Sequence, residues 1–330
     1  MPSRNRHVIA VVVLVPLLAA LALWAFAWPA SRIAPRDLPL GVAGPPAAAA
    51  QVEKQLERHE GAFEIHRYAD EAAARSAIED RSVYGAVVVT QQGPELLTAS
   101  AAGPAVAQFL QQAVERQAAA GGAQVRTVDV VPTPASDPRG AALSAAVLPL
   151  ALAGIAAGAV VTLLGLRGVR AAFALLGASA LVGVAAAGIA HSWLGALGGD
   201  WWAEAGVLAL STLAVGGAVA GLAALVGPAG TGIAAAVVML IGNPFSGATS
   251  APQMLPEPAG AIGQWLPPGA GTTLLRSVSS FDGAAATGPA LTLTWWAVLG
   301  LGAVLLGSSL RPRKTGGEPA AGQREISAVA

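Results

Sequence analysis

The sequence predicts a membrane all-α bundle of six transmembrane helices, with an extracytoplasmic α/β domain inserted between helices one and two. Hydrophobic residues make up 54% of the 330 residues and charged residues only 12%, about half the charged share of an ordinary soluble protein. Residues 31–140 nevertheless hold 10 of the 19 basic and 13 of the 19 acidic residues, which predicts one water-facing domain. Charge is absent from five long stretches: 7–31, 141–166, 171–199, 205–256 and 283–310.

The uncharged stretches have the length of membrane-spanning helices. A hydrocarbon core about 30 Å thick requires roughly 20 residues at about 1.5 Å per residue. Four stretches therefore hold one helix each, and 205–256 has room for two. Glycine and proline within them are tolerated, because neighbouring helices satisfy the freed backbone groups. The predicted spans are 8–29, 142–165, 171–194, 205–226, 229–247 and 290–310.

The first span, within 1–30, could be either a cleaved signal peptide or an uncleaved signal anchor. Its basic start and the Ala-Phe-Ala before Trp28 are shared with cleaved signal peptides. Its apolar run over 8–28 is longer than the roughly 7–15 residues of a cleaved segment. This length favours an uncleaved signal anchor.

Lys and Arg residues flank the predicted spans on one side of the membrane. An excess of Lys and Arg is typical of short cytoplasmic loops. The opposite connection 195–204 holds only Asp200 and Glu204. We therefore expect a plasma-membrane protein with both termini cytoplasmic and 311–330 as a disordered cytoplasmic tail. The flanking cations are Arg4, Arg6, Arg167, Arg170, Arg311, Arg313 and Lys314. Tryptophans near the predicted outer ends are typical of an interfacial belt: Trp24, Trp28, Trp193, Trp201, Trp202 and Trp265.

The region 31–140 predicts a small α/β domain with a partly parallel sheet, because strand and helix patterns alternate along it. Asp70 is the expected N-cap of one helix, and prolines over 132–138 make a stiff connector to the second span. Strands are predicted at 38–43, 63–68, 84–89, 95–100 and 124–131, and helices at 45–60, 71–80 and 104–119.

The sequence contains no motif of a familiar catalytic or nucleic-acid-binding site. Net charge is zero, and no basic patch carries interleaved aromatics, which argues against nucleic acid as a partner. Cysteine is absent, which excludes thiolate chemistry. There is no phosphate-binding Gly-Lys loop, zinc-binding His pair or serine elbow. We expect no enzyme activity, no cofactor and no metal in this chain, so any ATPase must be another chain.

Histidines are the remaining titratable candidates. The six predicted spans contain no acidic or basic residue, and His191 is the only titratable group near one of them. It has either a packing role beside Trp193 or a role in gating or substrate contact. His59 and His66, near Glu60 and Glu64, are interpreted as surface residues rather than metal ligands. Small residues four apart predict close helix packing: Gly154 with Gly158, and Gly217 with Gly221.

The segment 243–288 is too polar and proline-rich to span a membrane, yet it is amphipathic. We predict two short helices, at about 257–266 and 269–280, lying in or dipping into the outer interface. The alternative is an ordered segment that caps the bundle. The apolar face consists of Ile262, Trp265, Leu266, Leu274, Leu275, Val278 and Phe281.

Several motifs of this segment resemble those of one family. Asn243-Pro244-Phe245-Ser246-Gly247, Leu266-Pro267-Pro268-Gly269-Ala270-Gly271, Arg276 and Phe281-Asp282-Gly283 are similar to the closing segment of actinobacterial ABC transporter permeases of the type-2 exporter class, related to the phage infection protein group. The stretch AIEDRSVYGAVVV, within 72–89, resembles a helix followed by a strand in the outer domain of that family.

The resemblance implies a permease that works as a homo- or heterodimer in the lipid bilayer with separate cytoplasmic ATPase subunits, exporting a hydrophobic or amphipathic substrate. It places short re-entrant helices before the last span. Candidate substrate-contact or gating residues are Asn243, Pro244, Trp265, Gly269, Gly271, Arg276, Asp282 and His191. The loops 167–170 and 227–228 are very short, so no amphipathic helix for contact with an ATPase is found there.

Two other functions remain open. A membrane-anchored interaction protein, such as a secretion accessory or surface receptor, would act through 31–140 alone. A membrane enzyme would have to assemble a site from Asn243, His191, Asp200, Glu204 and Asp282.

Overall fold

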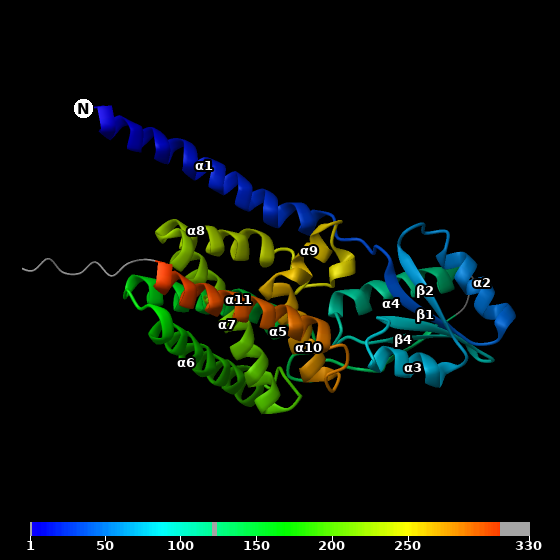
Figure 1. Ribbon diagram of the computed structural model, residues 1–330. Coiled ribbons are helices and arrows are strands. Elements are labelled where there is room, and N and C mark those ends of the chain that lie inside the picture. The colour runs from blue at the N-terminus through cyan, green and yellow to red at the C-terminus, as the bar shows by residue number, and fades with distance from the viewer. Residues whose placement is uncertain (1, 121–123, 311–330) are drawn as a thin grey trace, which may run out of the picture.

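The chain is seen here as a computed structural model that describes residues 2–120 and 124–310. An α/β domain packs at one end of a bundle of long helices, and the described ends of the first and last helices lie at the opposite end (Figure 1). We call these the sheet end and the loop end of the bundle. The predicted tail 311–330 lies outside the described residues.

Five described helices are long and apolar enough to cross a membrane, which indicates a multi-pass membrane protein. Four of them extend as the sequence predicts, and α6 continues into a π-helical turn, η1 (Gly188–Trp193). The five helices are α1 (Pro2–Ser31), α5 (Ala141–Leu163), α6 (Gly168–Ala187), α7 (Trp201–Val226) and α11 (Thr287–Leu310).

The helix predicted over 229–247 is shorter than expected. It consists of α8 (Pro228–Val237) and a π-helical turn, η2 (Val238–Gly242), before the chain turns at Asn243. Its length is about 22 Å at about 1.5 Å per residue, less than the hydrocarbon thickness. The prediction of a sixth membrane-crossing helix is therefore not confirmed.

Helix α7 is the centre of the bundle, and glycines bring its backbone close to the neighbouring helices. A Cβ on Gly158 of α5 would lie 2.6 Å from the Gly216 carbonyl oxygen. A Cβ on Gly300 of α11 would lie 2.3 Å from the Gly217 carbonyl carbon. The predicted close packing at small residues is confirmed for both pairs.

Helix α1 is nearly separate from this bundle. Over residues 8–23 it exposes large apolar side chains such as Val12 and Leu17, at 65% and 61%. Near its end Trp28 meets the ring of Phe245 edge-on at 6.0 Å. Among the described residues, α1 therefore packs against the rest of the chain only near its C-terminal end (Figure 1).

The α/β domain is a five-stranded sheet with helices on both faces. The strand order is β2-β1-β3-β4-β5, and all neighbours are parallel except β3 and β4. The predicted strands, helices and Asp70 cap are confirmed, since Asp70 accepts from the Ala73 N–H. The elements are β1 (Leu38–Ala43), α2 (Pro46–Leu56), β2 (Phe63–Tyr68), α3 (Glu71–Glu79), β3 (Gly85–Thr90), β4 (Gly93–Thr98), α4 (Pro104–Ala120) and β5 (Arg126–Asp129).

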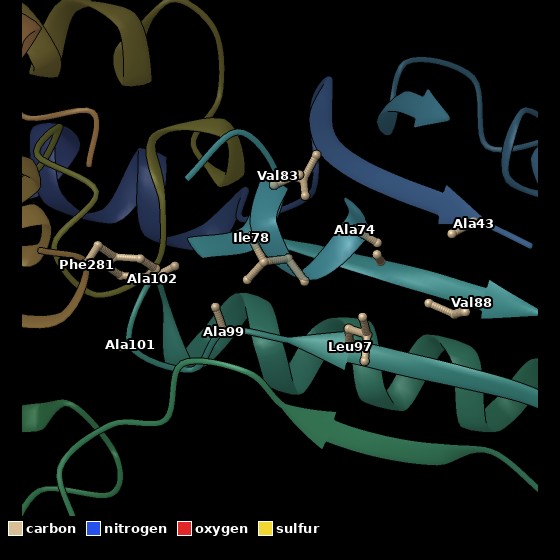
Figure 2. Packing of buried hydrophobic residues seen from close by; sticks show 12 residues of the cluster. Ala43, Ala74, Ile78, Val83, Val88, Leu97, Ala99, Ala101, Ala102 and Phe281 are labelled. Carbon is tan, nitrogen blue, oxygen red and sulfur yellow. The ribbon is translucent and has the colours of Figure 1, made fainter. Parts of the chain in front are cut away.

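The segment after η2 holds the domain at both faces of its sheet. Phe281 joins the core between the sheet and α3, where Ile78 and Leu97 are fully buried (Figure 2). Met254 joins the core on the other face, with Leu110 of α4. The domain therefore shares its hydrophobic core with the bundle.

The two helices predicted in this segment are present as α9 (Ala259–Trp265) and α10 (Pro267–Ser280), after a 3-10 turn, η3 (Pro252–Met254). Helix α10 packs against α7, α11 and α5 and is mostly buried. Its predicted apolar residues Leu274 and Leu275 face protein rather than lipid. Only α9 presents exposed apolar side chains, Ile262 and Trp265.

We predict that Gly300→Ala destabilises the bundle by about 1–3 kcal/mol, the usual effect of overpacking a tight contact. The added methyl group would overlap the α7 backbone. Thermal unfolding of the full chain in detergent measures the effect.

Gly302→Ala is the matched control on the same helix, because its Cβ would meet nothing within 4 Å. Equal unfolding midpoints for the two variants would contradict the close contact between α7 and α11.

Candidate functional site

A polar cavity of about 220 Å³ lies where the α/β domain meets α10. The sheet domain, the η3 turn, α9 and α10 all contribute to its wall, so its residues come from segments far apart in the sequence. The lining residues are Pro39, Arg81, Ser82, Val83, Tyr84, Ala102, Pro252, Gln253, Gln264, Thr273, Arg276 and Ala285.

Arg81 reaches this cavity from the turn between α3 and β3. Its backbone is left-handed, with φ of 59°. Its Nη1 donates to the Thr273 carbonyl oxygen at 3.0 Å and to Ser277 Oγ, and its guanidinium lies 5.2 Å from the centre of the Phe281 ring. Burial lowers the pKa of Arg81. Arg81 therefore attaches the domain to α10.

Arg276 reaches the same cavity from α10 and is only 3% exposed. Its Nη2 donates to the Ala248 carbonyl oxygen at 2.6 Å, and Nη1 lies within 3.4 Å of the Gly247 carbonyl oxygen. Burial, together with the positive charge of Arg81, lowers the pKa of Arg276 to about 10, despite an opposing effect of Tyr84. The group remains a cation at neutral pH.

Neutral polar side chains complete the wall. Tyr84 Oη donates to Gln253 Oε1 at 2.9 Å, and burial raises the pKa of the Tyr84 phenol. Thr273 Oγ1 donates to Gln264 Oε1 at 2.7 Å, and Gln264 Nε2 donates to the Ser246 carbonyl oxygen at 3.1 Å. One hydrogen bond thus links the domain to the η3 turn, and a separate pair links α10 through α9 to the turn after η2.

This cavity has an unbalanced charge. It has two arginines in its wall and neither aspartate nor glutamate. The ion pairs among the described residues involve other arginines or histidines, and none places a carboxylate within 4.0 Å of Arg81 or Arg276. Buried charges in proteins are ordinarily paired.

A second polar site lies between α6 and α7. His191 Nδ1 and Glu204 Oε2 are 2.8 Å apart, and Glu204 Oε1 accepts from the Gly199 N–H at 2.8 Å. Glu204 is fully buried in the first turn of α7. The prediction that the spans contain no acidic residue is therefore wrong. Helix α7 begins at Trp201, one turn before the predicted start at 205, and this first turn includes Glu204.

The third feature is an apolar cavity of about 390 Å³ between α7, α8 and α11. It adjoins the break between α9 and α10, where Trp296 Nε1 donates to the Trp265 carbonyl oxygen at 2.8 Å. The lining residues are Ala218, Gly221, Leu222, Leu225, Ile233, Ala234, Val237, Val238, Leu266, Pro267, Trp295, Trp296, Leu299, Gly300 and Ala303.

The structure brings only some of the sequence-predicted site residues to these cavities. Arg276 lines the polar cavity. Gly269 and Gly271 are packing residues. A Cβ on Gly269 would lie 2.2 Å from the Gly263 carbonyl oxygen, and one on Gly271 would lie 2.7 Å from Ser211 Oγ. Asp282 and Trp265 are exposed.

Asn243 and Pro244 form the turn that ends η2. The Asn243 carbonyl oxygen accepts from Ser246 Oγ at 2.7 Å, so this motif shapes the chain that Arg276 then binds. Of the residues proposed for a membrane enzyme, His191 and Glu204 are joined by a side-chain contact, and Asp200 meets Glu204 through the backbone alone.

His59 and His66 lie at the surface of the domain, and His59 is exposed. His66 Nε2 lies 3.4 Å from Glu64 Oε1 on the outer strand β2, and both side chains are well exposed. Among the described residues, no three histidine or acidic side chains are grouped as metal ligands would be.

Sequence reasoning missed Arg81, Tyr84 and Gln253 as members of a site. Arg81 and Tyr84 lie in the stretch AIEDRSVYGAVVV, which the family resemblance singled out, but Gln253 is some 170 residues away in the chain. Their contact depends on how the domain docks on the bundle. Such docking between distant segments produces no recognisable pattern in the local sequence.

Comparison of the chain with protein-family models, with curated proteins and with solved structures finds no match.

We predict that Glu204→Ala lowers stability by about 1–3 kcal/mol, because the partly buried Gly199 N–H loses its acceptor. Glu204→Gln keeps an acceptor and loses less. Thermal unfolding in detergent measures both. Glu257→Ala, at an exposed glutamate, is the control. A midpoint for Glu204→Ala equal to that of the control would show that the buried contacts are not stabilising.

Proposed function

We propose that this chain is the membrane-spanning permease subunit of an ATP-driven exporter, which moves a hydrophobic or amphipathic substrate outward. The apolar cavity between α7, α8 and α11 is the observation that carries the proposal. Its wall offers almost only hydrocarbon and tryptophan, which suits the apolar part of a substrate.

Helix breaks beside this cavity support a transport role. The short helix α8 ends in the π-helical turn η2, and α9 and α10 meet at Leu266 in the cavity wall. Such interruptions are tolerated within membranes where protein or a cavity surrounds them, and π-helical turns often occur at functional sites. In this proposal α8 and η2 form a sixth, short crossing.

The proposed arrangement places the loop end in the cytoplasm and the α/β domain outside the plasma membrane. A separate ATPase chain docks at the loop end, where a hollow of about 200 Å³ includes Arg167, Gly227 and Ser308. Two permease subunits assemble with it. ATP binding to the ATPase moves the spans and opens a path for the substrate from the apolar cavity.

A second candidate is a membrane-anchored interaction protein. The outer strand β2 favours it, because Phe63–Tyr68 pairs with β1 and with no other strand in the described part of the chain. An unpaired strand edge accepts a strand from a partner. This function would require the domain but not the cavity in the bundle.

We expect Ile233→Trp to lower export of a fluorescent amphiphile at least about tenfold, the usual effect of crowding an apolar pocket. Ile233 lines the cavity and is 52% exposed, so the larger indole ring fits without preventing the chain from folding. Export is measured in intact cells at equal membrane levels of each variant.

Ile189→Trp is the matched control, since Ile189 is 51% exposed and lies outside the cavity. Equal export by both variants, together with partner binding by the full chain that Ile233→Trp leaves unchanged, would favour the interaction protein over the exporter.

We also expect an ATPase subunit to co-purify with the full chain from native membranes. Arg167→Glu should weaken this association, because Arg167 is exposed at the loop end, whereas Arg139→Glu at the sheet end should not. Mass spectrometry of the purified complex measures the ratio of the two chains. Absence of an ATPase, with export unchanged on gene deletion, would contradict the exporter.

A further inference from the structure

The polar cavity between the α/β domain and α10 has a charge that nothing in its wall balances. Arg81 and Arg276 both line it, and its other polar members are Ser82, Tyr84, Gln253, Gln264 and Thr273. A buried cation without a counterion is costly. The cavity is also far larger than the roughly 10–15 Å³ that one water needs, at about 220 Å³.

The hydrogen bonds of the two guanidiniums leave donors unused. A guanidinium carries five N–H donors. Among the described residues, the partners of Arg276 are the carbonyls of Gly247 and Ala248, and those of Arg81 are the Thr273 carbonyl and Ser277. Donors of each arginine therefore remain for a ligand.

Other parts of the wall also offer donors rather than negative charge. Gln253 Oε1 accepts a hydrogen bond from the Tyr84 hydroxyl, which fixes the orientation of the Gln253 amide. The N–H₂ group of this amide bonds to no described residue. It is therefore available as a donor. The two arginines and Gln253 come from the domain, α10 and the η3 turn. Three donor side chains from three separate elements can share the several oxygens of a phosphoryl group.

We propose that this cavity binds a phosphoryl group, with Arg81 and Arg276 as its cationic ligands and Gln253 as a neutral donor. Guanidinium groups match phosphate oxygens in both geometry and charge. The phosphoryl group belongs either to a phospholipid headgroup or to a water-soluble phosphate. The site does not depend on the export function, because it lies outside the apolar cavity.

The bound group would also act on the fold. Arg81 and Arg276 repel each other across the contact between domain and bundle, and an anion between them turns this repulsion into attraction. Occupancy of the cavity therefore tightens the docking of the α/β domain on α10.

The test uses the purified full chain in detergent and three probes. Inorganic phosphate, phosphatidic acid and diacylglycerol with the same acyl chains are each titrated, with binding read by native mass spectrometry and by thermal unfolding. We expect phosphatidic acid to bind and to raise the unfolding midpoint, and diacylglycerol to do neither. Stabilisation by inorganic phosphate as well would identify a soluble phosphate as a sufficient ligand.

Arg81→Gln should weaken the binding of phosphatidic acid by about tenfold, the size expected for a charge-assisted hydrogen bond. Arg75→Gln is the matched control, since Arg75 lies on the same domain and pairs with Glu71. Gln253→Glu tests the site without removing an arginine. It should abolish binding and raise the midpoint without ligand, because its carboxylate takes the place of the phosphoryl group.

The proposal is overturned if phosphatidic acid binds no better than diacylglycerol and inorganic phosphate has no effect. It is equally overturned if Gln253→Glu retains the affinity of the unaltered chain. Either result is distinguishable from failure of the exporter proposal, because export plays no part in these measurements.

Discussion

The close approach of α7 to its neighbours is the constraint on which the rest of the molecule depends. Glycines on α5, α6 and α11 let their backbones touch α7, with no room for a methyl group at Gly158, Gly183 or Gly300. Helices in lipid gain little from apolar burial alone, so such close packing holds the bundle together. The bundle in turn gives α10 a surface on which it is buried, and α10 carries the α/β domain.

The domain and the bundle form one folded unit. Phe281 and Met254 complete the cores on the two faces of the sheet, and the Ala34 N–H donates to the Met254 carbonyl oxygen at 3.0 Å. Arg81 and Arg276 meet at this contact. The polar cavity therefore exists only because the two parts dock, and a change in one part alters the site in the other.

Much of this architecture could be predicted from the sequence, and the reasons are local. Uncharged stretches, alternating strands and the Asp70 cap are patterns within a few residues, and the helices and strands of 31–140 follow them closely. The sequence did not predict that Glu204 lies in α7, because a buried carboxylate is stable there only through His191 and Gly199. Nor did it predict that α10 is buried by protein rather than lipid, since both surroundings select the same apolar side chains. The apolar cavity also depends on how α7, α8 and α11 pack, which their composition does not specify.

Among the described residues, helix α1 meets the rest of the chain near its end, where Ala25 is buried, η2 lies close and Trp28 contacts Phe245. Its exposed part has few protein neighbours, so the helix can adjust to a bilayer of different thickness by tilting about this contact. Phe245 belongs to the same turn as Gly247, whose carbonyl oxygen lies beside Arg276. The aromatic contact that holds α1 is thus made by the same turn that positions this arginine.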